Sequence, residues 1–108
     1  MDNLISIMEA IGIPYAYDHF AEGESPAPPF ICFLCPGSDN FAADGRVYFK
    51  INLVHIELYT DEKNPEIENQ VETVLDEHGI FYDKTEVWIE SERLYEVLYS
   101  FEEVKPHE

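Results

Sequence analysis

Positive charge is scarce in this sequence. Only six of its 108 residues are lysine or arginine, against 23 aspartates and glutamates, which gives a formal net charge of -17 at pH 7. A nucleic-acid-binding protein needs a basic surface that neutralises phosphates, and this composition provides none. Anionic lipid headgroups would repel the chain for the same reason. We therefore expect no direct binding to nucleic acid or to membranes. The acidic surface would serve solubility or a partner with a basic patch.

Long apolar runs and a secretory leader are also missing. No segment approaches the ~18 consecutive apolar residues of a membrane-spanning helix. The first twelve residues, MDNLISIMEAIG, contain two acids and no basic cluster, so we expect no signal peptide. Cysteine is rare as well, with two residues in the chain. Without a secretory signal, these two thiols are expected to be reduced, in a cytosol.

Apolar and aromatic residues, by contrast, are plentiful. Hydrophobic residues make up 45% of the chain and include seven Phe, seven Tyr and one Trp. A disordered acidic tail has far fewer such residues, because it cannot bury enough apolar surface to fold. The length suits one modest hydrophobic core. We therefore expect a single folded domain over residues 1–108.

Two segments have the apolar periodicity of a helix. The first begins at Asp2 or Asn3, either of which can cap it, and ends at Gly12. The second is capped by Asn64 and ends at Gly79. The predicted core face of the first helix consists of Leu4, Ile5, Met8 and Ile11. That of the second consists of Ile67, Val71, Val74, Leu75 and His78.

Strand patterns account for most of the remaining chain. Extended segments are expected at 13–23, at 30–35, at 46–60 as one long bent strand or two, and on both sides of a polar break at 91–93. Residues 36–45 are expected to form a loop and residues 103–108 a frayed tail. The order of elements predicts an α+β fold, with a mainly antiparallel sheet and two helices packed on one face.

A C-x-x-C motif lies in the segment FICFLC, at Cys32 and Cys35. In thiol oxidoreductases of the thioredoxin type this motif opens a helix, whose dipole lowers the pKa of the first thiol. Here Pro36 and Gly37 follow the motif, and no helical pattern begins before Asn64. Residues three apart in a strand point to opposite faces, so the two sulfurs would diverge. The pattern favours buried cysteines in a strand, and a thiol oxidoreductase is the weaker alternative.

The sequence contains no clear motif for binding a metal, a phosphate or a dinucleotide. Structural zinc sites need four ligands at short, paired spacings, and the histidines are scattered singly along the chain, at His19, His55, His78 and His107. EF-hand, phosphate-binding and dinucleotide-binding signatures are all absent from the sequence. We therefore expect a protein that is not an enzyme, with no catalytic residue, no metal and no cofactor.

Aromatic residues on strands that also carry acids indicate a self-association surface. A small domain has limited room to bury both faces of a sheet, and aromatic residues are enriched at the cores of interfaces. The aromatic residues concerned are Phe41 in the expected loop and, on the strands, Tyr48, Tyr59, Trp88, Tyr95 and Tyr99. Of these, Phe41, Tyr48, Trp88 and Tyr95 are expected at the interface. The alternative is that the two helices cover most of these side chains.

The sequence from about residue 13 to residue 102 resembles a known group of proteins, most clearly in GSDNFAADG, VHIELYTD and EVLYSFE. It is similar to small virion proteins encoded in the tail-assembly regions of phages and prophages of Gram-positive bacteria. More loosely, it resembles the tail-terminator, or tail-completion, proteins of long-tailed phages. The similarity lies in the overall pattern and includes no catalytic signature.

The resemblance implies a compact α+β protomer that joins a ring, commonly a hexamer, at the head-proximal end of the tail tube. Its partners would be copies of itself, the tail tube and neck proteins, and it would reside in the virion after assembly in the bacterial cytoplasm. Asp39, Asn40, Phe41 and the strand from Arg46 would face a neighbouring subunit. The rival function class is an acidic inhibitor that mimics DNA, which the net charge of -17 motivates.

Overall fold

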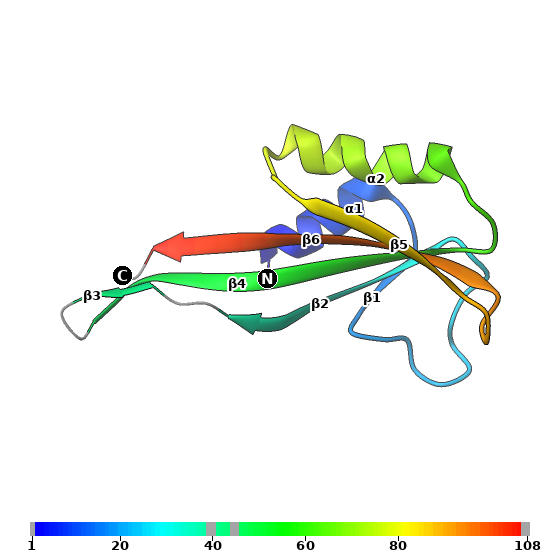
Figure 1. Ribbon diagram of the computed structural model, residues 1–108, viewed down its shortest axis with the longest axis horizontal. Coiled ribbons are helices and arrows are strands. Elements are labelled where there is room, and N and C mark those ends of the chain that lie inside the picture. Colours follow the sequence, from blue (N-terminus) through cyan, green and yellow to red (C-terminus); the bar gives the residue numbers. More distant parts are fainter. Residues whose placement is uncertain (1, 39–40, 44–45, 107–108) are drawn as a thin grey trace.

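A six-stranded sheet with two helices on one face forms the molecule (Figure 1). The structure is a computed structural model that describes residues 2–38, 41–43 and 46–106. In chain order the elements are α1 Asp2–Ile11, β1 Tyr15–Tyr17, β2 Phe30–Ser38, β3 Phe41–Ala43, β4 Arg46–Thr60, α2 Pro65–Glu77, β5 Asp83–Ile89 and β6 Leu94–Pro106. The predicted α+β fold is confirmed.

The strands follow the order β1-β2-β4-β6-β5, and β3 pairs with β4 outside this path. Strand β1 runs parallel to β2, and the other pairs are antiparallel. A parallel pair needs a long crossover, and residues 18–29 provide it. Both tyrosines of β1 lie against the ring of Phe33, with centroid distances of 6.0 Å for Tyr15 and 5.3 Å for Tyr17. The two side chains therefore share one face of the strand, as the sequence predicts.

The core lies between the helices and one face of the sheet. Val54, Ile56 and Leu58 of β4 are fully buried there, as their alternation predicts. The register places them opposite Phe101, Tyr99 and Val97 of β6, respectively. From the helices, the core receives Leu4, Ile7, Met8 and Ile11 of α1 and Val71 and Leu75 of α2.

Helix α1 ends where the sequence predicts but presents a different face. Gly12 has a φ of +80°, a left-handed conformation that favours glycine and ends the helix. Ile5, predicted to face the core, is instead 38% exposed, while Ile7 is buried. Leu4, Ile7, Met8 and Ile11 are linked by spacings of three and four and form one face of the helix. Ile5 has such a spacing only to Met8, so it lies at the edge of this face and is partly exposed.

Helix α2 has the predicted ends. The Asn64 side chain accepts a hydrogen bond from the backbone N–H of Ile67 at 3.2 Å, and Gly79 has a φ of +68°. The predicted place of His78 on the core face is wrong, because His78 is the exposed C-terminal cap residue. Its ring Nδ1 lies 2.8 Å from the carbonyl oxygen of Val74, one turn back on the same helix.

Two segments contain more strand than the sequence predicts. The expected loop at 36–45 includes the end of β2 and the three residues of β3. The expected tail at 103–108 is strand up to Pro106, because its backbone pairs with residues 49–52 of β4. Residues 46–60 form one strand rather than two. In each case the partner strand, rather than the local sequence, determines the extended conformation.

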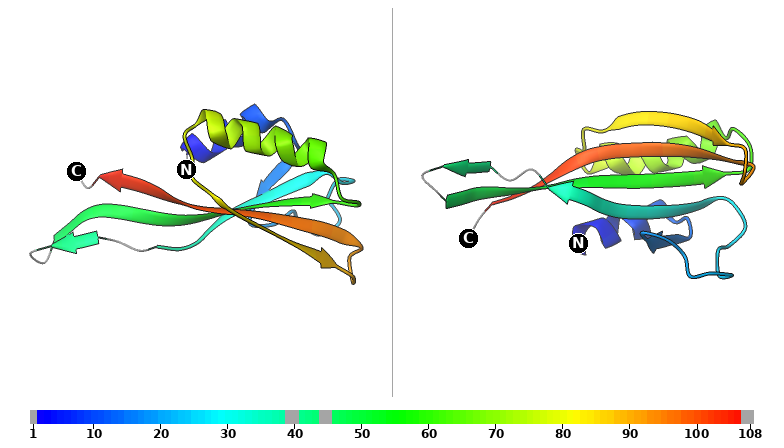
Figure 2. Two further views of the ribbon diagram at one scale, coloured as in Figure 1. Left: turned by 45° about the horizontal axis from the view of Figure 1, so that its top comes forward. Right: turned by 60° about the horizontal axis from the view of Figure 1, so that its bottom comes forward.

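The far parts of β4 and β6, together with β3, extend beyond the helical layer. We call this the arm: residues 41–43, 46–52 and 103–106. It gives the molecule an elongated shape, with extents of 49 × 29 × 22 Å. Figure 2 shows that neither helix covers the arm, and that the turn between β5 and β6 lies at the opposite end of the sheet.

Candidate functional site

The two cysteines are free and lie on opposite sides of β2. Cys32 is buried under the crossover segment 18–29, whereas Cys35 packs against the helix-covered core. Burial, with the negative charges of Glu57 and Asp18, raises the pKa of the Cys32 thiol. A raised pKa disfavours the thiolate, which is the nucleophilic form. This geometry confirms the prediction of strand cysteines and does not resemble a thiol oxidoreductase site.

A tyrosine joins two carboxylates on the sheet face opposite the helices. The hydroxyl of Tyr59 lies 3.0 Å from Glu57 Oε1 and 3.0 Å from Glu96 Oε2. Burial and the two negative charges raise the pKa of Tyr59. Burial also raises the pKa of Glu57, although the hydrogen bond from Tyr59 opposes the shift. A hydroxyl that holds its proton this firmly is a structural donor rather than a base.

A groove of about 630 Å³ lies beside this tyrosine, between the crossover segment 18–29 and the turn that joins β5 to β6. We call it the acidic groove. Its apolar lining includes Phe20, Phe30, Tyr59, Ile89 and Leu94, and its carboxylates are Asp18, Glu22 and Glu92. The rings of Phe30 and Tyr59 stack with a centroid distance of 5.1 Å. Aromatic faces beside carboxylates suit a cationic side chain, which gains both ion pairing and cation–π contact.

A second cleft of about 760 Å³ lies where the chain leaves α2 and enters β5. Its lining includes Asn3, His78, Phe81, Asp83 and Glu102. Phe81 is 91% exposed, more than any other large hydrophobic side chain that the structure describes. The sequence does not mark Phe81 as unusual, because the apolar residues around it match the start of an ordinary strand.

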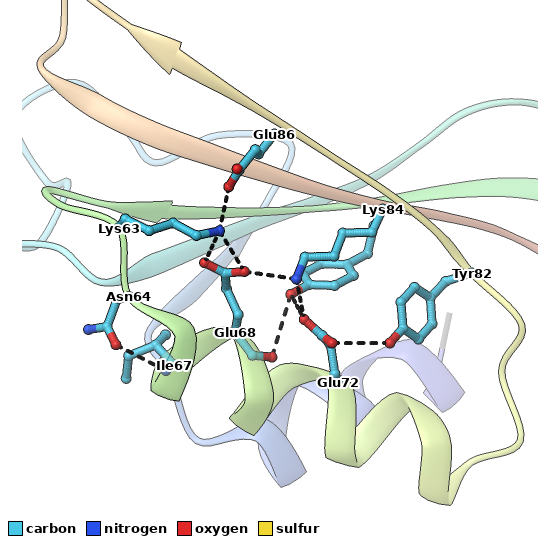
Figure 3. Close-up of polar contacts among 9 residues, drawn as sticks. Lys63, Asn64, Ile67, Glu68, Glu72, Tyr82, Lys84 and Glu86 are labelled. Atoms are coloured by element: carbon cyan, nitrogen blue, oxygen red, sulfur yellow. Dashed lines mark hydrogen bonds and ion pairs between the residues drawn. The ribbon is translucent and has the colours of Figure 1, made fainter.

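The sequence reasoning also missed an ion-pair network between α2 and β5 (Figure 3). Glu68 is only 4% exposed, and its carboxylate lies 2.8 Å from both Lys63 Nζ and Lys84 Nζ. Lys84 also pairs with Glu72 at 2.7 Å, and Lys63 with Glu86 at 2.6 Å. The sequence did contain a sign of this burial, because Glu68 lies three residues before the buried Val71 and therefore on the same face of α2. The network fixes the edge strand to the helix and includes two of the chain's six basic residues.

The burial of Glu68 would on its own raise the pKa of its carboxyl, but the hydrogen bonds and charges of Lys63 and Lys84 outweigh it, so the pKa is lowered. The pKa of Lys84 is raised, because Glu68 and Glu72 outweigh the effect of burial. The hydroxyl of Tyr99 donates to Glu72 Oε2 at 2.8 Å and extends the network into the core. All members are therefore paired, as a buried charge requires.

The predicted interface residues fall into two groups. Asp39 and Asn40 lie outside the described residues. Phe41 in β3, and Arg46 and Tyr48 in β4, belong to the arm. The second group is Trp88 of β5 and Tyr95 of β6, whose rings lie 4.9 Å apart. Both residues are close in sequence to the turn between β5 and β6, which lies at the opposite end of the sheet from the arm (Figure 1).

The second group leaves part of its aromatic surface open. Trp88 is 39% exposed, and its indole N–H donates to Glu90 Oε2 at 2.5 Å. Tyr95 is half-buried, and the neighbouring Val87 is 52% exposed. The helices therefore cover these side chains only in part.

Within residues 2–38, 41–43 and 46–106, no three His, Cys, Asp or Glu side chains are grouped so that they could hold a metal ion. Neither of the two helices described is long and apolar enough to cross a membrane. No model of a known protein family matches the sequence, and no curated protein matches it. The fold and surfaces define an elongated α+β protein. An arm lies at one end, and the acidic groove and the Trp88–Tyr95 pair lie toward the other, on opposite faces of the sheet. The function is inferred from the sequence resemblance and this geometry.

Proposed function

We propose that the protein is a non-enzymatic virion assembly protein of the tail-terminator type. Copies would form a closed ring, a hexamer in the arrangement that the resemblance implies, at the head-proximal end of a phage tail tube. The ring would present a surface to neck proteins. The protein would be assembled in the bacterial cytoplasm and retained in the virion. The resemblance of residues 13–102 to tail-region virion proteins motivates this proposal, and the α+β fold agrees with what that resemblance implies.

One observation supports the proposal most strongly. The residues expected at an interface lie at opposite ends of a molecule that is 49 Å long: Phe41, Arg46 and Tyr48 in the arm, and Trp88 and Tyr95 beside the far turn. A ring needs a heterologous contact, in which one surface of a subunit meets a different surface of the next. Two distinct surfaces at opposite ends suit such a contact.

The charge of the protein is compatible with this role. A ring around a DNA channel benefits from negative charge, because like charges let DNA pass without sticking. Six basic residues against 23 acidic ones satisfy that condition for most of the surface. No direct contact with nucleic acid is needed for this function.

The distribution of acids favours assembly over mimicry of DNA. A mimic needs carboxylates along one elongated face. Here exposed acids lie on α2, at Glu66 and Glu77, which is on the helix side of the sheet. Others lie at Asp18 and Glu22 in the crossover on the opposite side (Figure 1). Charge on both sides is what a generally acidic surface produces.

Size-exclusion chromatography with light scattering, combined with negative-stain electron microscopy, tests the proposal. The expected result is a concentration-dependent oligomer that appears as closed rings, in solution or on tail tubes of the phage or prophage that encodes the protein. A protein that stays monomeric at millimolar concentration and does not bind such tubes would overturn the proposal.

A further inference from the structure

Charge is distributed unequally along the molecule. Three of the six basic residues, Arg46, Lys50 and Lys105, belong to the arm. The segments 41–52 and 103–106 contain only two acids, Asp44 and Glu103, so the arm sequence is net positive while the remaining chain is strongly negative. In the backbone register of β4 and β6, Lys50 is the partner of Lys105.

The basic residues outside the arm are largely committed to internal contacts. Lys63 is ion-paired with Glu68 and Glu86, and Lys84 with Glu68 and Glu72. These two lysines hold α2 to β5 and contribute little positive field of their own. The remaining basic residue, Arg93, is exposed in the turn between β5 and β6, next to Glu92 of the acidic groove. Half of the basic residues, three of six, therefore belong to the arm.

The acidic groove has the chemistry to receive that charge. Its rim carries the exposed carboxylates of Asp18, Glu22 and Glu92, and its floor includes the stacked rings of Phe30 and Tyr59. Its volume of about 630 Å³ has room for several side chains. Arginine in particular stacks on aromatic faces while its guanidinium binds carboxylates.

We propose that the arm of one copy docks into the acidic groove of a second copy. This inference rests on the proposed function, since it names the contact by which the ring would close. The groove is lined in part by residues 89–94 at the turn between β5 and β6. That turn and the arm lie at opposite ends of the subunit (Figures 1 and 2), so one chain cannot satisfy the contact by itself. Repetition of this contact is heterologous and produces a ring when the rotation closes.

Charge-swap variants test the docking. The arm variant carries Arg46→Glu and Lys50→Glu, and the groove variant carries Glu22→Lys and Glu92→Lys. Sedimentation equilibrium of each variant alone should give self-association at least about tenfold weaker than that of the unmodified protein, because like charges then face each other. An equimolar mixture of the two variants should associate again, because each altered arm meets an altered groove of opposite charge.

Two controls make the result specific. Glu66→Lys with Glu77→Lys changes the net charge on α2 as much as the groove variant does, and it should leave association unchanged. Phe81→Ser alters the second cleft and should also have no effect. Circular dichroism and thermal unfolding of every variant would show that the fold is retained.

The outcomes separate the two proposals. If the unmodified protein associates but the charge reversals have no effect, or the mixture fails to associate, the docking is wrong and the ring proposal stands. If Phe81→Ser, and not the groove variant, abolishes association, the arm does not dock in the acidic groove. If the unmodified protein is monomeric in solution and on tail tubes, the ring proposal itself fails.

Discussion

At the scale of single residues, Glu68 shows how strongly this acidic protein depends on its few lysines. Its carboxylate is buried and contacts Lys63 and Lys84, which themselves are only partly covered. We expect Glu68→Gln to lower the free energy of unfolding by about 1–3 kcal/mol, less than for a fully buried pair because water screens both lysines. Urea unfolding at pH 7 measures this loss.

The lowered pKa of Glu68 determines the direction in which pH changes the stability of the fold. Despite its burial, Glu68 has a lowered pKa in the folded protein because of the two lysines. Its stabilising effect is therefore complete above the ordinary glutamate pKa of about 4.3 and is lost as pH falls through the lower folded value. Glu66→Gln, an exposed change on the same helix, is the matched control. Equal unfolding midpoints for the two variants would show that the network does not stabilise the fold.

Glu57 is expected to behave in the opposite way. One hydroxyl proton on Tyr59 serves two carboxylate oxygens, at 3.0 Å each, so the two charges are incompletely compensated. Burial raises the pKa of Glu57 in the folded protein. Stability should therefore fall as pH rises from about 4.3 through the raised value, and stay lower above it.

Glu57→Gln should remove that fall and raise the melting temperature at pH 7 by a few degrees. The gain should shrink below pH 4, where Glu57 itself is protonated in both states. Scanning calorimetry between pH 3 and pH 8 measures both effects, with the exposed Glu102→Gln as the control. A variant less stable than the unmodified protein at pH 7 would mean that the ionised carboxylate is needed in the fold.

The thiols offer a direct test of the oxidoreductase alternative. Cys32 is 6% exposed and its pKa is raised by burial, so its alkylation by iodoacetamide at pH 7 should be far slower in the folded protein than in urea. Mass spectrometry after timed quenching resolves the two cysteines. Rapid modification of Cys32 in the folded state would restore the oxidoreductase alternative.

At the scale of elements, the helices were predictable because their signals are local. Asn64, Pro65 and Gly79 define both ends of α2 within its own sequence, and the structure agrees. The strand pairings were harder to predict from the sequence. Nothing local in residues 15–17 indicates a parallel pairing with β2, and nothing in residues 103–106 indicates a partner in β4. Such pairings depend on residues distant in sequence, which periodicity does not report.

The cap of α2 gives a prediction at this scale. Asn64→Ala removes the acceptor for the backbone N–H of Ile67 and should destabilise the protein by about 1 kcal/mol. Asn69→Ala, at an exposed position in the middle of the same helix, should instead be neutral or slightly stabilising, because alanine is the better helix former. Chemical denaturation of both variants measures the difference. Equal losses would mean that the side chain of Asn64 does not cap the helix.

At the scale of the whole molecule, strand order decides where the candidate site lies. The sequence suggested Phe41, Arg46, Trp88 and Tyr95 as interface residues, without indicating that they form two groups. The order β1-β2-β4-β6-β5 and the length of β4 separate those groups by most of the long axis. The acidic groove was not predictable either, because it brings the crossover 18–29 against residues 89–94. Only the pairing of distant strands creates that contact.

The position of the core along β4 leads to a prediction for the molecule as a whole. The β4 residues of the hydrophobic core cluster, among the side chains that the structure describes, are Val54, Ile56 and Leu58, which follow the arm in the sequence. Ser38 of β2 is the register partner of Asn52 of β4, so these two residues can be joined by a two-residue Asn-Gly turn in place of residues 39–51. The shortened protein should keep its fold, with a free energy of unfolding within about 1 kcal/mol of the full chain, because Val54, Ile56 and Leu58 of β4 are all kept.

The same deletion should abolish self-association, because the arm is the basic partner of the proposed contact. Light scattering across a concentration series measures association, and urea unfolding of the same samples measures stability. The matched control replaces only Ala42 and Ala43 with serine, which keeps the length and charge of the arm. A shortened protein that still forms the oligomer would place the interface on the body, where Trp88, Tyr95 and the exposed ring of Phe81 offer the remaining apolar surface. A shortened protein that unfolds would instead show that the arm stabilises the sheet through its pairing with β6.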